Sequence, residues 1–162
     1  MSHELLPQLK QAAAAKKKAH QKLVRKLAKE DGKKLDREIH QLHEEVFACT
    51  DCLQCANCCK TTGPLFTRKD IDRISKHLKM KAADFEEKYL RVDEDGDHVL
   101  QSVPCTFLGE DNYCSIYDVR PKACREYPHT DRDKQQQILH LTRKNASICP
   151  AVFTILERVL ER

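Results

Sequence analysis

Cysteine is the residue type in this sequence whose number and spacing could do chemistry. Nine cysteines stand among 162 residues, and five of them fall between positions 49 and 59. Cys49, Cys52, Cys55 and Cys58 recur at every third position, and Cys59 follows directly. Cysteines separated by two residues can direct their sulfurs at one ion, because the backbone between them folds into a tight turn. The repeated spacing therefore indicates metal binding.

Four cysteines lie far from this run and could complete such a centre. They are Cys105, Cys114, Cys124 and Cys149. A tetrahedral ion takes four ligands, so nine thiols exceed one site and match two four-cysteine sites with one thiol to spare. The adjacent Cys58 and Cys59 are poorly placed to bind one ion as a pair, so they face different metals or one of them bridges. We expect a two-metal or cluster-type centre.

Two other uses of the cysteines fit the sequence less well. A disulfide framework belongs to exported proteins, whereas nine is an odd number and the first twenty residues lack the order of a secretory signal. Unliganded cysteines can pack as small hydrophobes, but Asp51, Gln54 and Asn57 make the surrounding segment polar. Metal ligation is therefore the favoured interpretation.

The hydrophobic pattern predicts an α+β fold: a small, irregular, cysteine-rich and helix-dominated metal-binding domain with an N-terminal helical hairpin. Residues 3–30 and 33–47 are predicted to be the two helices of the hairpin, because apolar residues recur in them at near-helical spacing. We expect residues 1–46 to form this extension and residues 47–162 to form the cysteine-cluster domain.

Other elements are predicted to hold the later cysteines in place. Thr67 and Asp70 have the spacing of a helix N-cap box, and Asp95-Gly96 is typical of a hairpin turn. Further predicted elements are a helix from 82 to 90, strands at 90–92, 98–103 and 137–142, a short helix after Pro121 and a last helix from Pro150.

The charge distribution bears on partners. The formal charge is +4, and the whole surplus lies in the first 48 residues. Acidic residues are interleaved and no aromatic side chain precedes Phe47, which favours a solvated helix face over a nucleic-acid arm. We therefore expect a metal ion as partner, leave a protein partner open for the basic hairpin, and expect no nucleic acid.

No apolar run approaches the ~20 residues of a membrane span, so we expect a cytoplasmic protein and no membrane.

Several separated blocks of the sequence resemble one family. Cys52-Leu-Gln-Cys55-Ala-Asn-Cys58-Cys59 matches the signature of the bacterial and archaeal CxxCxxCC proteins, the YkgJ-type zinc- or iron-chelating domains. The similarity continues through FTRKDIDRISKHL, PCTFL and CSIYDVRPKACR to Cys149-Pro150, over about residues 47 to 151. The family usually has glycine where this chain has Ala56.

The resemblance implies metal chelation through eight matching cysteines. They are Cys52, Cys55, Cys58, Cys59, Cys105, Cys114, Cys124 and Cys149. Cys49 lies outside the signature and is expected to be the spare thiol, and His129 is kept as a substitute ligand. His40 and His43 lack the order of a hydrolytic zinc motif and are expected to face solvent.

The metal and any turnover stay open at this point. Soft thiolates suit both zinc and iron, and an iron–sulfur cluster is a close second to a chelated ion. One relative of the family, flagellin lysine methylase, is an enzyme with a similar cysteine pattern. The alternative function is therefore an iron–sulfur protein with a redox or protein-modifying activity. With four glycines the chain has no glycine-rich loop for a methyl donor, so no catalytic residue is assigned.

Overall fold

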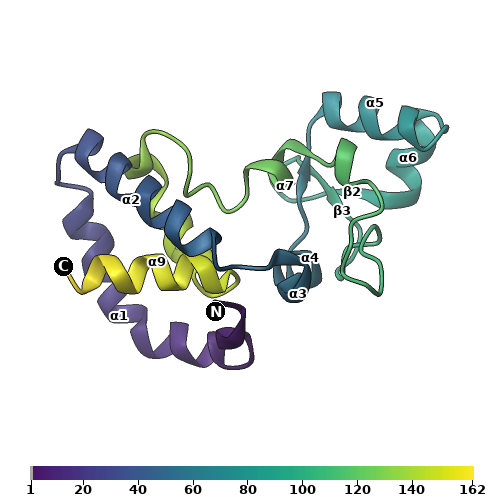
Figure 1. The fold of residues 1–162 in the computed structure, drawn as a ribbon. Helices are drawn as coiled ribbons and strands as arrows, with labels where there is room; N and C mark the ends of the chain where they lie inside the picture. Colours follow the sequence, from purple (N-terminus) through teal and green to yellow (C-terminus); the bar gives the residue numbers. More distant parts are fainter. Residues whose placement is uncertain (1) are drawn as a thin grey trace. The chain divides into compact units, whose positions relative to one another are not determined.

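The protein divides into two compact parts. The structure is a computed structural model that describes residues 2–162, with side chains from Glu4 onwards (Figure 1). Unit 1 consists of the chain up to Asn57 together with Pro128–Arg162, and unit 2 is Cys58–Tyr127. The separate hairpin domain expected for residues 1–46 stays a prediction.

Unit 1 is built from helices around one apolar core. Its elements are the 3₁₀ helices η1 (Ser2–Gln8) and η3 (Gln135–Ile138) and the α-helices α1 (Leu9–Leu27), α2 (Gly32–Phe47), α3 (Cys52–Cys55), α8 (Leu139–Asn145) and α9 (Pro150–Leu160). In Figure 1, α9 (yellow) runs between α1 (purple) and α2 (blue). Pro150 suits the first turn of α9, and Val152, Ile155 and Leu156 are fully buried along it. Burial of these apolar faces is the main stabilising contribution in unit 1.

The first predicted helix is shorter than expected. An α-helix was expected from residue 3, whereas η1 covers the first turns and α1 begins at Leu9. Pro7 has no amide hydrogen to donate, and its ring disfavours an α-helical turn before it. The second helix begins as the sequence predicts, because the carboxylate of Asp31 accepts a hydrogen bond from Lys34 N at 2.7 Å.

The predicted strand at 137–142 is wrong. These residues form the end of η3 and the start of α8. Buried positions recur with helical spacing here, but polar side chains occupy three of them: Gln135, Thr142 and Asn145. Each donates to a backbone carbonyl oxygen, Gln135 to His129 and Asn145 to Pro128, so their burial is tolerated.

Unit 2 combines short helices with a small sheet. Its elements are α4 (Asn57–Thr61), which begins at the last residue of unit 1, α5 (Arg68–His77), α6 (Ala82–Tyr89), η2 (Tyr117–Val119), α7 (Lys122–Glu126) and the strands β1 (Leu65–Phe66), β2 (Leu90–Val92) and β3 (His98–Leu100). The sheet is antiparallel with the order β1-β3-β2. Phe66, Phe85 and Phe107 are buried in its core. The helix-dominated α+β fold predicted from the sequence is confirmed.

Candidate metal centre

The CxxC segment of unit 1 is a single helical turn. The carboxylate of Asp51 accepts hydrogen bonds from Leu53 N and Gln54 N and begins α3. The turn ends at Ala56, whose φ of 45° lies in the left-handed region and whose N–H donates to Cys52 O. Glycine adopts this conformation without strain, which explains the glycine usual in the family at this position. Cys52 and Cys55 are therefore close to each other, because they are the first and last residues of one helical turn.

Cys149 lies near this turn. It directly precedes α9, and its thiol accepts hydrogen bonds from Ala151 N and Val152 N. Burial raises the pKa of Cys149 to about 11, and the negative charges of Cys55 and Cys52 add to the rise. The Asn57 side chain donates to Ile148 O at 2.6 Å and so fixes the segment before Cys149. Unit 1 therefore brings three of the predicted ligands into one electrostatic neighbourhood.

Two adjacent thiols begin the group in unit 2. The sulfurs of Cys58 and Cys59 lie 3.9 Å apart. Two ligands of a tetrahedral zinc–thiolate site lie about 3.8 Å apart, given a zinc–sulfur bond of about 2.3 Å. This separation suits one shared ion as well as two separate ions. The hydrogen bond from Cys58 lowers the pKa of Cys59 to about 7, with burial opposing and Lys60 assisting the change.

A tight loop carries two further thiols. Cys105 is tied to the early cluster by the hydrogen bond from its own N–H to Cys59 O at 2.8 Å. Leu108 and Cys114 then form an isolated antiparallel bridge, and the carboxylate of Asp111 accepts from Tyr113 N within the loop. This closure brings Cys105 and Cys114 together, and the negative charge of Cys114 contributes to the raised pKa of Cys105.

Cys124 is positioned by a buried carboxylate. Asp70 is 1% exposed, and its Oδ1 accepts from Arg73 at 2.6 Å and from Lys122 N, at the start of α7, at 3.1 Å. Arg73 in turn donates to the carbonyl oxygens of Val119 and Arg120. Burial opposes ionisation of Asp70, but the bonds from Thr67, Arg73 and Lys122 more than offset it and lower its pKa. The predicted cap box is present, with the Thr67 and Asp70 side chains each bonded to the other's backbone N–H.

The four thiols of separate segments in unit 2 influence each other electrostatically. Burial raises the pKa of Cys124 to about 12, and the charges of Cys59, Cys105 and Cys114 raise it further. Cys124 is exposed as a residue, yet enough protein surrounds its thiol for desolvation to dominate. Desolvation likewise raises the pKa values of Cys105 and Cys114.

Arg120 adds a positive charge beside the thiols of unit 2. Its guanidinium lies over the ring of Tyr117 at 3.8 Å from the centroid and donates to Tyr117 O. Its positive charge also opposes the rise in the pKa values of Cys114 and Cys124. Arg120 therefore stabilises thiolate in this group.

The remaining candidates also lie in unit 1. Cys49 is exposed and lines a cavity with Cys52. His129 has a φ of 69°, and its carbonyl oxygen accepts from Gln135. The expected solvent-facing histidines are half-buried instead: His40 bonds to Arg132 O, and His43 bonds to the Thr130 hydroxyl, both at 2.8 Å. Those bonds explain both histidines without a metal.

The donor atoms fit a soft metal by their chemistry. Within residues 2–162, no group of three or more His, Cys, Asp or Glu side chains has its donors already converged on one point. Each thiol, however, has three staggered rotamers, so a sulfur can turn without movement of the backbone. Clustered thiols whose charges repel are the donor set that zinc and iron prefer.

A distant relative matches part of the chain. A protein of Methanocaldococcus jannaschii, described as uncharacterized, is 33% identical over 82 residues, which are 49% of this chain and 44% of that protein. The chain thus spans less than half the length of that relative. No solved structure matches the chain.

None of the described helices combines the length and the hydrophobicity that crossing a lipid bilayer requires.

A family model matches over a longer stretch. It covers residues 51–150, well over half of the chain, and it takes in all eight predicted ligands but not Cys49. The description of that model is "putative zinc- or iron-chelating domain". By this match the chain belongs to the CxxCxxCC family, as the spacing of its cysteines predicts.

Proposed function

We propose that this protein binds zinc or iron through two groups of thiols, one in each unit. The first group is drawn from Cys58, Cys59, Cys105, Cys114 and Cys124 of unit 2, and the second contains Cys52, Cys55 and Cys149 of unit 1. The observation that carries the proposal is the mutual electrostatic influence of Cys59, Cys105, Cys114 and Cys124, which come from four separate segments.

The electrostatics supply a physical reason for cation binding. Thiolates are the metal-binding form, and here burial and mutual repulsion oppose their formation. A bound cation offsets both costs, so metal binding releases protons and stabilises the fold of the segments that carry the thiols.

The experiment is anaerobic purification followed by measurement of metal content, acid-labile sulfide and the visible spectrum. We expect about two ions per chain, since eight thiolates satisfy two tetrahedral ions. Colourless protein with zinc, or iron without sulfide, supports chelation. Brown protein with stoichiometric sulfide supports the iron–sulfur alternative predicted from the sequence. Metal-free protein that gains no metal on addition of Zn²⁺ or Fe²⁺ contradicts the proposal.

A further inference from the structure

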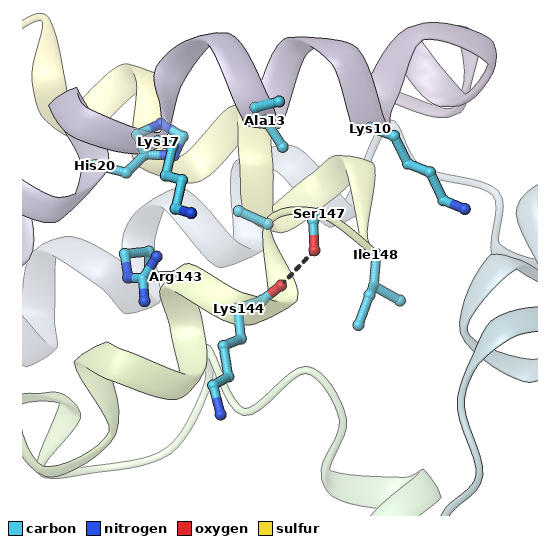
Figure 2. Close-up of a pocket in the computed structure, with 10 residues that line it drawn as sticks. Lys10, Ala13, Lys17, His20, Arg143, Lys144, Ser147 and Ile148 are labelled. Carbon is cyan, nitrogen blue, oxygen red and sulfur yellow. Dashed lines mark hydrogen bonds between the residues drawn. The ribbon is translucent and has the colours of Figure 1, made fainter.

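Unit 1 contains a basic cavity that the thiol chemistry does not use. It has a volume of about 370 Å³ and lies between α1, α8 and the segment that follows α8 (Figure 2). Its lining residues are Lys10, Ala13, Ala14, Lys17, His20, Arg143, Lys144, Ala146, Ser147 and Ile148. Four of these ten carry a full positive charge, and none is acidic. None of them is a cysteine.

Two of the cations face each other across the cavity. In Figure 2, Lys17 extends from α1 towards α8, where Arg143 lies opposite, while Lys10 and Lys144 extend away from the cavity. Within the described part of the chain, neither Lys17 nor Arg143 forms an ion pair or donates a side-chain hydrogen bond. Like charges directed at one space favour an anion between them.

The carboxylate that side chains of α1 contact already has two basic partners. Glu157 on α9 bonds to Lys16 at 2.5 Å and to His20 Nε2 at 2.8 Å. His20 is 2% exposed and lines the cavity, so one of the two partners of Glu157 is part of the cavity wall. The adjacent lysines therefore differ: Lys16 has a carboxylate partner, and Lys17 is left to the cavity.

Size and composition limit the class of ligand. A water occupies about 30 Å³ of liquid, so the cavity has room for roughly a dozen non-hydrogen atoms. Small-molecule sites commonly begin at about 300 Å³. No aromatic side chain other than His20 lines the cavity, so it offers little surface on which a nucleic-acid base could stack.

We propose that this cavity binds a small organic anion that carries at least two phosphate or carboxylate groups. Lys17 and Arg143 hold one anionic group by charge-assisted hydrogen bonds, and Lys10 and Lys144 attract the ligand from the rim. The proposal concerns a site separate from the thiols, and it stands or falls independently of metal binding.

The test is calorimetric titration of the 162-residue protein, as purified under anaerobic conditions, with 3-phosphoglycerate and, in a second arm, with tricarballylate. Both probes chelate metals weakly, and metal content is measured again after each titration. We expect saturable binding with one probe or both at one per chain, weaker at higher salt. Tighter binding of 3-phosphoglycerate indicates a preference for an anion that contains a phosphate, and tighter binding of tricarballylate indicates a preference for carboxylates alone.

Matched variants assign the binding to the cavity. Lys17→Gln and Arg143→Gln should each weaken binding about tenfold, since each removes a charge-assisted hydrogen bond. Lys18→Gln is the control: Lys18 is exposed on the same helix and does not line the cavity. Far-UV circular dichroism verifies that every variant is folded. The proposal is overturned by no saturable binding of either probe or by equal losses in all three variants.

Discussion

The two thiol groups are held in different ways. In unit 2, Cys59, Cys105, Cys114 and Cys124 lie on four separate segments, and hydrogen bonds of Asp70 and Arg73 fix the segment before Cys124. In unit 1, Cys52 and Cys55 share one helical turn, and only Cys149 comes from elsewhere in the chain. A ligand group assembled by tertiary contacts should bind metal and fold together, whereas a local turn can keep its shape without metal.

The largest expected effect comes from removing one thiol of each group. Cys124→Ser and Cys55→Ser should each lower metal content by about one ion per chain, because a serine oxygen is a poor ligand for a soft site. Of the two variants, only Cys124→Ser should also lower the free energy of unfolding of unit 2. All four tyrosines lie in unit 2 and the chain has no tryptophan, so tyrosine fluorescence during urea unfolding reports on that unit.

This pair of variants can break the comparison. If Cys55→Ser shifts the tyrosine unfolding curve as much as Cys124→Ser does, the two groups are one cooperative site. If neither variant changes the metal content, the assignment of ligands is wrong.

Asp70→Asn tests the support beneath Cys124. We expect a loss of about 2 kcal/mol in the free energy of unfolding of unit 2 at pH 7, because a buried charged acceptor is removed. The lowered pKa of Asp70 means that its contribution is complete above about pH 4, near the unfolded-state pKa, and is lost as the pH falls through the folded-state value.

The pH dependence supplies the check on Asp70. The stability difference between wild type and Asp70→Asn should shrink as the pH is lowered below about 4, and a constant difference would exclude the carboxylate charge as its source. Asp72→Asn is the control: that carboxylate is 59% exposed and pairs with the exposed Arg68, so a change within about 0.5 kcal/mol is expected.

A smaller effect is expected at the end of the CxxC turn. Ala56→Gly should stabilise unit 1 by about 0.5 kcal/mol, since relief of left-handed strain exceeds the entropy that glycine adds to the unfolded chain. The readout is thermal unfolding followed at 222 nm. In contrast, Ala15→Gly, at an exposed position in α1, should destabilise by about 1 kcal/mol.

The smallest effect is expected for the spare thiol. Cys49→Ser should leave metal content and unfolding unchanged, because Cys49 lies outside the family match. Measuring the metal content of this variant and of Cys55→Ser by elemental analysis shows which thiols of unit 1 bind metal. An equal loss of metal in both would make Cys49 a ligand.

Local features of the fold were predictable, and long-range ones were not. The Thr67–Asp70 cap and the Asp95-Gly96 hairpin were predicted because their side chains act within a few residues. The helix at α8 was missed, since polar Gln135, Thr142 and Asn145 hide its buried face from a hydrophobic pattern.

The same distinction between local and long-range features applies to the candidate site. The thiols stand out by spacing alone, but their separation into two groups depends on where the chain returns to unit 1, at Pro128. The role of Asp70 at Lys122 N also depends on tertiary structure, because 52 residues separate the two positions. No local pattern carries that information.

The discontinuity of unit 1 has a consequence for biosynthesis. The core that contains Leu27 and Ile39 also contains Ile155 and Leu156 of α9, which are translated more than a hundred residues later. On the ribosome, the apolar faces of α1 and α2 therefore stay exposed until α9 has been synthesised. Unit 2, Cys58–Tyr127, can fold before that point. A nascent chain arrested before Pro150 would be a substrate for chaperones and proteases, even with unit 2 complete.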